Sequence, residues 1–220
     1  MLFLDSASPT EFARWYGVGA VDGLTSNPSI LARGTARTDW DATYVALLEV
    51  APLAPVSIEV LSEDPRVVVE QARAYHQLGS NVVIKVPVAM SDHDTRGALA
   101  LIKDLASEGI KVNATAVFSP LQALLAAKAG ARYVSIFAGR LLDRDIDATE
   151  TISNTRRLLD VEVAGVEMIA ASVRHPGNIS SWLRAGAHIV TVPESMMDKA
   201  LLDPRTLEVV GEFRKARESA

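Results

Sequence analysis

The sequence predicts an α/β protein with a (β/α)8 TIM barrel, built as a single domain over residues 1–220. Eight short apolar runs rich in β-branched residues alternate with amphipathic stretches from one end of the chain to the other. This alternation is typical of parallel sheets covered by helices. A doubly wound open sheet shows it too, but eight regular units are more than most open sheets contain. No glycine-rich phosphate-binding motif follows the first apolar run, which argues against a dinucleotide-binding fold.

The eight expected strands are short and mostly apolar, which is the composition of strands that are buried on both faces. In chain order they cover residues 1–5, 21–26, 56–61, 81–88, 111–118, 132–139, 166–173 and 187–193.

Helical patterns are clearest in three of the intervening stretches, residues 64–79, 94–110 and 119–131. A glycine stands just before the next strand in four places, where a left-handed glycine is expected to end the helix. These glycines are Gly79, Gly109, Gly130 and Gly186. The tail, residues 201–220, predicts a further helix after the eighth unit, which could cover a barrel end or a neighbouring subunit.

Composition excludes several classes of protein. The net charge is −5 and basic residues do not form a block, so a nucleic-acid-binding protein is not expected. The absence of cysteine removes disulfides, thiolate nucleophiles and Cys-ligated zinc. The first residues lack the pattern of a signal peptide, and no apolar run has the length of a membrane span. We therefore expect a soluble cytoplasmic protein.

Metal binding is not expected either, because the four histidines do not have the spacing of a metal site. The run SDHD, residues 91–94, is the most metal-like segment. We interpret it instead as a solvated loop that caps a helix.

Polar residues gather where the expected strands end, and the carboxyl ends of barrel strands are where TIM-barrel active sites form. In chain order these residues are Asp5, Thr25, Asn27, Glu59, Lys85, Asn113, Thr115, Ser135, Phe137 (an aromatic exception), Arg140, Ser172 and Arg174. A full ring of such groups at one mouth predicts an active site.

Lys85 is the central candidate because it interrupts an apolar strand. It could be an edge-strand lysine that reaches solvent, but a closed barrel has no edges. Burial lowers the pKa of a lysine, and a neutral amine attacks carbonyl groups to form a Schiff base. Glu59 lies between apolar neighbours, where a carboxylate must be paired or hydrogen-bonded. With Asp5, which by itself could be a turn residue, it supplies candidate proton-transfer groups.

The other strand-end residues allow two interpretations each. Asn27 is expected to cap a helix that begins at Pro28, and it could also hold a ligand hydroxyl. Arg140 and Arg174 could form surface salt bridges, but two arginines with Ser172 at neighbouring strand ends suit a phosphate group better.

Five motifs together resemble the transaldolase family over essentially the whole chain: LTSNPSI, VVIKVPV, EGIKVNATAVFS, FAGRLLD and AASVR. The length and C-terminal segment are similar to a short subgroup that also contains fructose-6-phosphate aldolases. Members use no cofactor or metal, act on sugar phosphates, and commonly assemble as homo-oligomers, pentamers or decamers.

The resemblance also implies roles for the residues of the expected ring. Lys85 matches the Schiff-base lysine, Asp5 the acid/base residue, and Glu59 with Thr115 the pair that holds a catalytic water. Three residues match positions that hold hydroxyls of the dihydroxyacetone unit: Asn27, Asn113 and Ser135. The phosphate site is matched by Arg140, Ser172 and Arg174, and the aromatic pocket wall by Phe137.

The implied activity is that of a transaldolase, which transfers a dihydroxyacetone unit from a ketose phosphate to an aldose phosphate. The alternative is a fructose-6-phosphate aldolase, but those enzymes typically carry glutamine and tyrosine where this chain has Glu59 and Phe137. An insertion at residues 89–97 leaves the acceptor open. A non-catalytic sugar-phosphate binder and a deoxyribose-phosphate aldolase are further alternatives, the latter requiring a second lysine such as Lys103 or Lys111.

Overall fold

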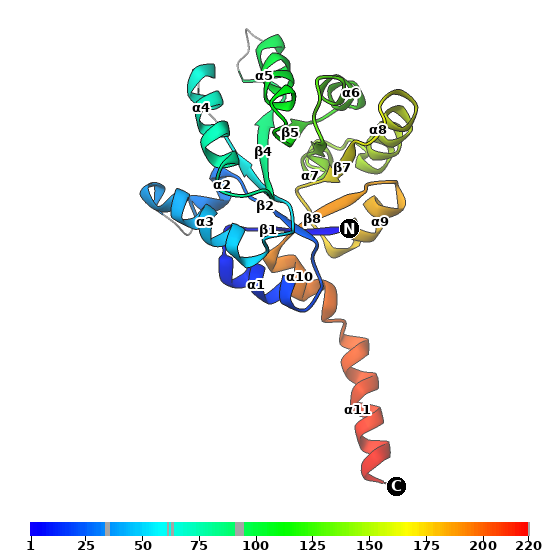
Figure 1. The fold of residues 1–220 in the computed structure, drawn as a ribbon. Helices are drawn as coiled ribbons and strands as arrows, with labels where there is room; N and C mark the ends of the chain where they lie inside the picture. Colours follow the sequence, from blue (N-terminus) through cyan, green and yellow to red (C-terminus); the bar gives the residue numbers. More distant parts are fainter. Residues whose placement is uncertain (34–35, 61, 63, 91–94, 220) are drawn as a thin grey trace.

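The computed structural model describes residues 1–33, 36–60, 62, 64–90 and 95–219, and over these it shows a closed barrel of eight parallel strands (Figure 1). Each strand pairs with its neighbours in chain order, and the last pairs with the first. The strands are β1 (Leu2–Asp5), β2 (Gly23–Thr25), β3 (Val56–Glu59), β4 (Val82–Pro87), β5 (Val112–Val117), β6 (Tyr133–Ile136), β7 (Glu167–Ala170) and β8 (Ile189–Pro193). The predicted (β/α)8 barrel is confirmed.

Helices surround the barrel. They are α1 (Pro9–Gly17), α2 (Pro28–Leu31), α3 (Trp40–Val50), α4 (Pro65–His76), α5 (Thr95–Ser107), α6 (Pro120–Lys128), α7 (Ala138–Leu142), α8 (Ala148–Glu162), α9 (Pro176–Arg184), α10 (Glu194–Leu201) and α11 (Pro204–Glu218), with a 3-10 turn at Arg37–Asp39. Many start with a proline directly after a residue whose side chain caps the helix. In α2 the predicted cap is confirmed, because Asn27 Oδ1 accepts a hydrogen bond from the Ile30 amide at 3.0 Å.

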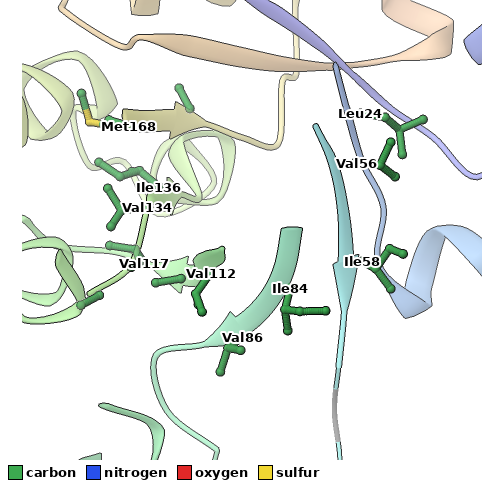
Figure 2. Close-up of a cluster of buried hydrophobic side chains, with 14 of the residues drawn as sticks. Leu24, Val56, Ile58, Ile84, Val86, Val112, Val117, Val134, Ile136 and Met168 are labelled. Carbon is green, nitrogen blue, oxygen red and sulfur yellow. The ribbon is translucent and has the colours of Figure 1, made fainter. Parts of the chain in front are cut away.

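Two apolar layers hold the barrel together. Side chains that point outward from the strands, such as Leu24, Ile58 and Ile84, pack under the helices (Figure 2). Inside the barrel, a second cluster fills the space with five buried side chains, which we call the apolar floor. It consists of Phe3, Val83, Tyr133, Ile169 and Ile189. Lys85 lies two residues after Val83 on β4, so the floor lies below the lysine in the barrel.

The glycine prediction is confirmed at three positions and wrong at one. Gly109, Gly130 and Gly186 have φ values of 81°, 107° and 107°. Gly79 does not have a positive φ, because α4 already ends at His76. A Cβ on Gly79 would lie 2.7 Å from Asn81 Oδ1, so this glycine leaves room for a neighbouring side chain rather than reversing the chain.

The predicted C-terminal helix is α11, and it projects away from the barrel (Figure 1). It covers neither end of its own barrel, and none of its described residues is buried. Its apolar residues Leu207 and Phe213 are 61% and 68% exposed, and Val209 and Val210 are each 37% exposed. Among the described helices, none is both long and apolar enough to cross a membrane.

Candidate active site

A cavity of about 970 Å³ opens at the carboxyl ends of the strands. Polar and aromatic residues that the sequence singled out line it from six different strand ends. Those in its wall are Asp5, Thr25, Asn27, Glu59, Lys85, Ser135, Phe137, Arg140, Ser172 and Arg174. The barrel closure thus brings together groups that lie up to 169 residues apart in the chain (Asp5 to Arg174).

Lys85 lies inside the barrel and does not reach solvent along its stem. The residue is 4% exposed. Its Nζ is 3.0 Å from Glu59 Oε2 and donates to the Ser26 carbonyl oxygen at 3.1 Å. Glu59 and Lys85 are partners in the register between β3 and β4, which explains why the two side chains meet. The interpretation of Lys85 as a solvent-reaching edge lysine is therefore wrong.

Asp5 ends β1 in the wall of the same cavity and accepts a hydrogen bond from a neighbouring hydroxyl. Thr25 Oγ1 donates to Asp5 Oδ1 at 2.7 Å. Burial raises the pKa of Asp5, while the nearby Lys85 charge and the Thr25 hydrogen bond oppose that rise. A carboxyl with a raised pKa exchanges protons nearer to neutral pH, as a general acid/base needs.

Asn113 and Thr115 are the two expected site residues that do not line the cavity wall; both are fully buried on β5. Asn113 Nδ2 donates to Ser57 Oγ at 3.2 Å, and Asn113 Oδ1 accepts from Ser135 Oγ at 2.8 Å. The Asn113 side-chain amide thus orients the Ser135 hydroxyl through this hydrogen bond. Thr115 Oγ1 has no hydrogen-bond partner among the described residues. It precedes Ala116, whose φ of 56° accompanies a shift in the β5–β6 register.

The two arginines differ in their pairing. Arg174 Nε and Nη2 lie 3.1 and 2.5 Å from the two carboxylate oxygens of Asp143, which lowers the pKa of that carboxyl. Arg140 makes no ion pair within the described part of the chain, and its guanidinium carbon lies 5.3 Å from the centre of the Phe137 ring. Arg174 therefore lines the cavity while paired with a carboxylate, whereas Arg140 is the arginine more available for an anion.

A close backbone contact fixes this side of the cavity. Ser172, which follows β7, has a φ of 71°. A Cβ on Gly139 of α7 would lie 1.6 Å from the Ser172 carbonyl oxygen, and the Gly139 amide donates to the Ala171 carbonyl at 3.2 Å. Only glycine permits this approach, which holds Arg140 and Ser172 next to each other.

The model of the transaldolase/fructose-6-phosphate aldolase family matches residues 2–220. The chain belongs to this family. A probable transaldolase of Symbiobacterium thermophilum is 36% identical over 100% of this chain and 97% of its own length. Another, from Coprothermobacter proteolyticus, is 40% identical over 94% of this chain and 92% of its own. A probable transaldolase 2 of Listeria monocytogenes is 38% identical over 97% and 94%.

Solved structures share the fold at much lower identity. A putative dihydrodipicolinate synthase family protein from Coccidioides immitis superposes with a TM-score of 0.65 at 13% identity, over 99% of this chain and 72% of its own. Dihydrodipicolinate synthase from Rhodopseudomonas palustris gives 0.64 at 13%, over 99% and 77%. At this identity the likeness shows the barrel alone.

Several cavity residues of this family member were not found from the sequence: Arg33, Thr191 and Glu194 also line the wall. Thr191 is the middle residue of β8, where a threonine is ordinary, and Glu194 directly follows that strand. Glu194 accepts a hydrogen bond from Ser6 Oγ. Arg33 follows α2 and gave no sequence signal, because it lies well beyond its strand.

Two further expectations concern segments near the lysine. Residues 91–94, the SDHD run within the insertion, lie outside the described residues. Neither alternative lysine reaches the cavity wall: Lys103 is on α5, and Lys111 Nζ contacts the Ser80 carbonyl oxygen just before β5 begins. Neither residue can therefore serve as the second active-site lysine, and the deoxyribose-phosphate aldolase alternative is not supported.

Proposed function

We propose that this family member is a transaldolase, which transfers a dihydroxyacetone unit from fructose 6-phosphate or sedoheptulose 7-phosphate to an aldose phosphate. The observation that carries the proposal is the buried Lys85, whose Nζ lies 3.0 Å from Glu59 Oε2 in the wall of a cavity that also holds Asp5 and Arg140. The family membership supports the same reaction class.

The reaction begins when Lys85 loses a proton and its amine attacks the ketone carbon. Glu59 is the acceptor in direct contact with Nζ, so it takes this proton and returns it as the carbinolamine loses water. The product is an iminium ion bonded to Lys85. Thr115 has a buried hydroxyl without a partner among the described residues, which supports its role with Glu59 in holding the water that imine formation releases.

Carbon–carbon cleavage follows on the iminium. Asp5 removes the proton from the C4 hydroxyl, the C3–C4 bond breaks, and its electron pair moves to the iminium nitrogen to give an enamine. An aldose phosphate leaves. When the second aldehyde enters, the enamine attacks its carbonyl carbon, and Asp5 returns the proton to the new alkoxide. The raised pKa of Asp5 suits both steps.

The remaining residues hold the substrate in register. Asn27 and Ser135 line the cavity and supply hydrogen bonds to the hydroxyls of the three-carbon unit, and Asn113 orients Ser135. Arg140, with Ser172 and Arg174, binds the phosphate at the β6–β7 side, and Phe137 forms the apolar wall beside it.

Two assays test this function. Fructose 6-phosphate is incubated with and without erythrose 4-phosphate, and glyceraldehyde 3-phosphate and free dihydroxyacetone are measured. A transaldolase consumes fructose 6-phosphate only when the acceptor is present. Rapid release of dihydroxyacetone without acceptor would instead identify a fructose-6-phosphate aldolase.

The second assay traps the covalent intermediate. Borohydride is added with fructose 6-phosphate, and the peptide carrying residue 85 is weighed by mass spectrometry. The adduct is expected in the wild type and in Lys128→Arg, which alters an exposed lysine paired with Glu162. It should be absent in Lys85→Arg, which keeps the charge but forms no imine. An unmodified Lys85 in the wild type would leave only the non-catalytic binder.

A further inference from the structure

Three side chains in the cavity wall, from three consecutive strands of the closed barrel, form a hydrogen-bonded row. Thr191 of β8 has its Oγ1 2.6 Å from Thr25 Oγ1 of β2, and Thr25 Oγ1 lies 2.7 Å from Asp5 Oδ1 of β1. Both threonines are 2% exposed. The row crosses β1, which pairs with β2 on one side and β8 on the other.

The direction of these hydrogen bonds follows from counting protons. Each hydroxyl has one proton to donate. Thr25 donates its proton to the Asp5 carboxylate, so it can only accept at its second contact. Thr191 must therefore be the donor to Thr25. The row thus runs from Thr191 through Thr25 to Asp5. The hydrogen bond from Thr191 to Thr25 polarises the Thr25 hydroxyl and so strengthens its bond to Asp5.

We propose that Thr191 is a positioning residue of the reaction, which orients Asp5 and stabilises its carboxylate form through Thr25. This inference rests on the proposed function for the role of Asp5, but the hydrogen-bonded row itself does not. No rule based on charge or strand-end position pointed to Thr191, since a threonine inside a strand is ordinary. Its position in the row distinguishes it.

Other groups also act on Asp5, and they set the background for the effect. Lys85 of β4 and Arg33 after α2 favour the carboxylate, whereas Glu59 of β3 and burial disfavour it. The charged lining residue that follows β8 is Glu194, which is bonded to Ser6. Removing the Thr191 hydroxyl weakens one of the few stabilising contacts, so Asp5 should hold its proton to higher pH.

The test compares four variants over a range of pH. Thr191→Val replaces the hydroxyl by a methyl group of similar size, and Thr191→Ala removes the hydroxyl and leaves its space empty. Thr191→Ser keeps the hydroxyl. Thr155→Val is the control, because Thr155 is a fully buried threonine on α8 whose hydroxyl donates to the Thr151 carbonyl oxygen. The acidic limb of kcat/KM should move to higher pH by about 0.5 unit in the first two variants. Serine should restore it, and the control should not move it.

A second measurement needs no activity. Carbon-13 NMR of labelled aspartate carboxyls follows the titration of Asp5 in the free protein, with Asp5→Asn for assignment. The same upward shift is expected in Thr191→Val or Thr191→Ala. An unchanged Asp5 titration in either folded variant overturns the inference, as does a loss of activity that is equal at all pH values. An inactive wild type would contradict the proposed function alone, since the NMR titration still tests the row.

Discussion

Lys85 and Glu59 face each other across neighbouring strands, with Nζ and Oε2 3.0 Å apart and the two side chains 5% and 12% exposed. In the proposed reaction, this pair joins the nucleophile directly to the group that accepts its proton. A buried pair of this kind contributes little to stability relative to apolar residues. The proposed chemistry, rather than stability, accounts for such a pair in the wall of the cavity.

Glu59→Gln should therefore slow imine formation. The amide keeps the shape of the side chain and can still accept a hydrogen bond, but it cannot take a proton. We expect kcat to fall by about 10²-fold or more, with a smaller change in KM. Steady-state kinetics and the rate of adduct formation check this. Glu162→Gln, in the exposed pair with Lys128, should leave both unchanged; a full rate in Glu59→Gln would remove Glu59 from proton transfer.

Asp5→Asn should lose activity and gain stability at neutral pH. Because folding raises the pKa of Asp5 above its ordinary value of 3.8, the folded protein binds more protons than the unfolded chain above that pH. Stability therefore falls as the pH rises through this range. Asparagine removes the buried charge, so Tm should rise by roughly 2–4 °C at pH 7 and converge with the wild type near pH 3.5. Calorimetry at both pH values measures this, and a lower Tm at pH 7 would contradict it.

Arg140→Ala should weaken binding of the phosphate selectively. Arg174 is engaged by Asp143, whereas Arg140 has no ion pair in the described residues. Losing a charge-assisted contact should raise KM for fructose 6-phosphate by roughly 10–100-fold, with little change for unphosphorylated fructose. Arg144→Ala, a nearby exposed arginine outside the cavity wall, is the control. A similar loss for both sugars would place the phosphate elsewhere.

Gly139→Ala should destabilise the phosphate side of the barrel. The new methyl would lie 1.6 Å from the Ser172 carbonyl oxygen, so the backbone must shift. We expect a loss of roughly 2–4 kcal/mol in the free energy of unfolding, measured by denaturant titration, together with a higher KM. Gly17→Ala, where nothing lies within 4 Å of the added carbon, should be close to neutral. Equal stabilities of the two variants would show that the contact is relaxed.

The barrel was predictable because its strands are buried on both faces and its helices are amphipathic, so each element carries its own pattern. The strand-end rule placed Lys85, Glu59 and Arg140 in one cavity for the same reason. The rule fails where position depends on contacts between elements. Asn113 has the right place on β5 but turns toward Ser57 and Ser135.

Contacts between strands also explain what was missed or wrong. Thr191 is hydrogen-bonded to Thr25 on another strand, and no local sequence pattern encodes this contact. Gly79 stands before a strand like the other three glycines, yet its role is to make room for Asn81. A sequence identifies a residue type and its position along a strand or helix. Its contact partner on another strand is set only when the eight strands close into the barrel.

The apolar floor under Lys85 has a kinetic consequence. This floor fills the barrel interior beneath the lysine with Phe3, Val83, Tyr133, Ile169 and Ile189. Substrates and products can therefore reach the amine only through the mouth of the cavity above it. In the proposed reaction the aldehyde product has to leave through this mouth before the acceptor aldehyde enters. Double-reciprocal plots at several fixed acceptor concentrations should therefore give parallel lines, the signature of a ping-pong enzyme.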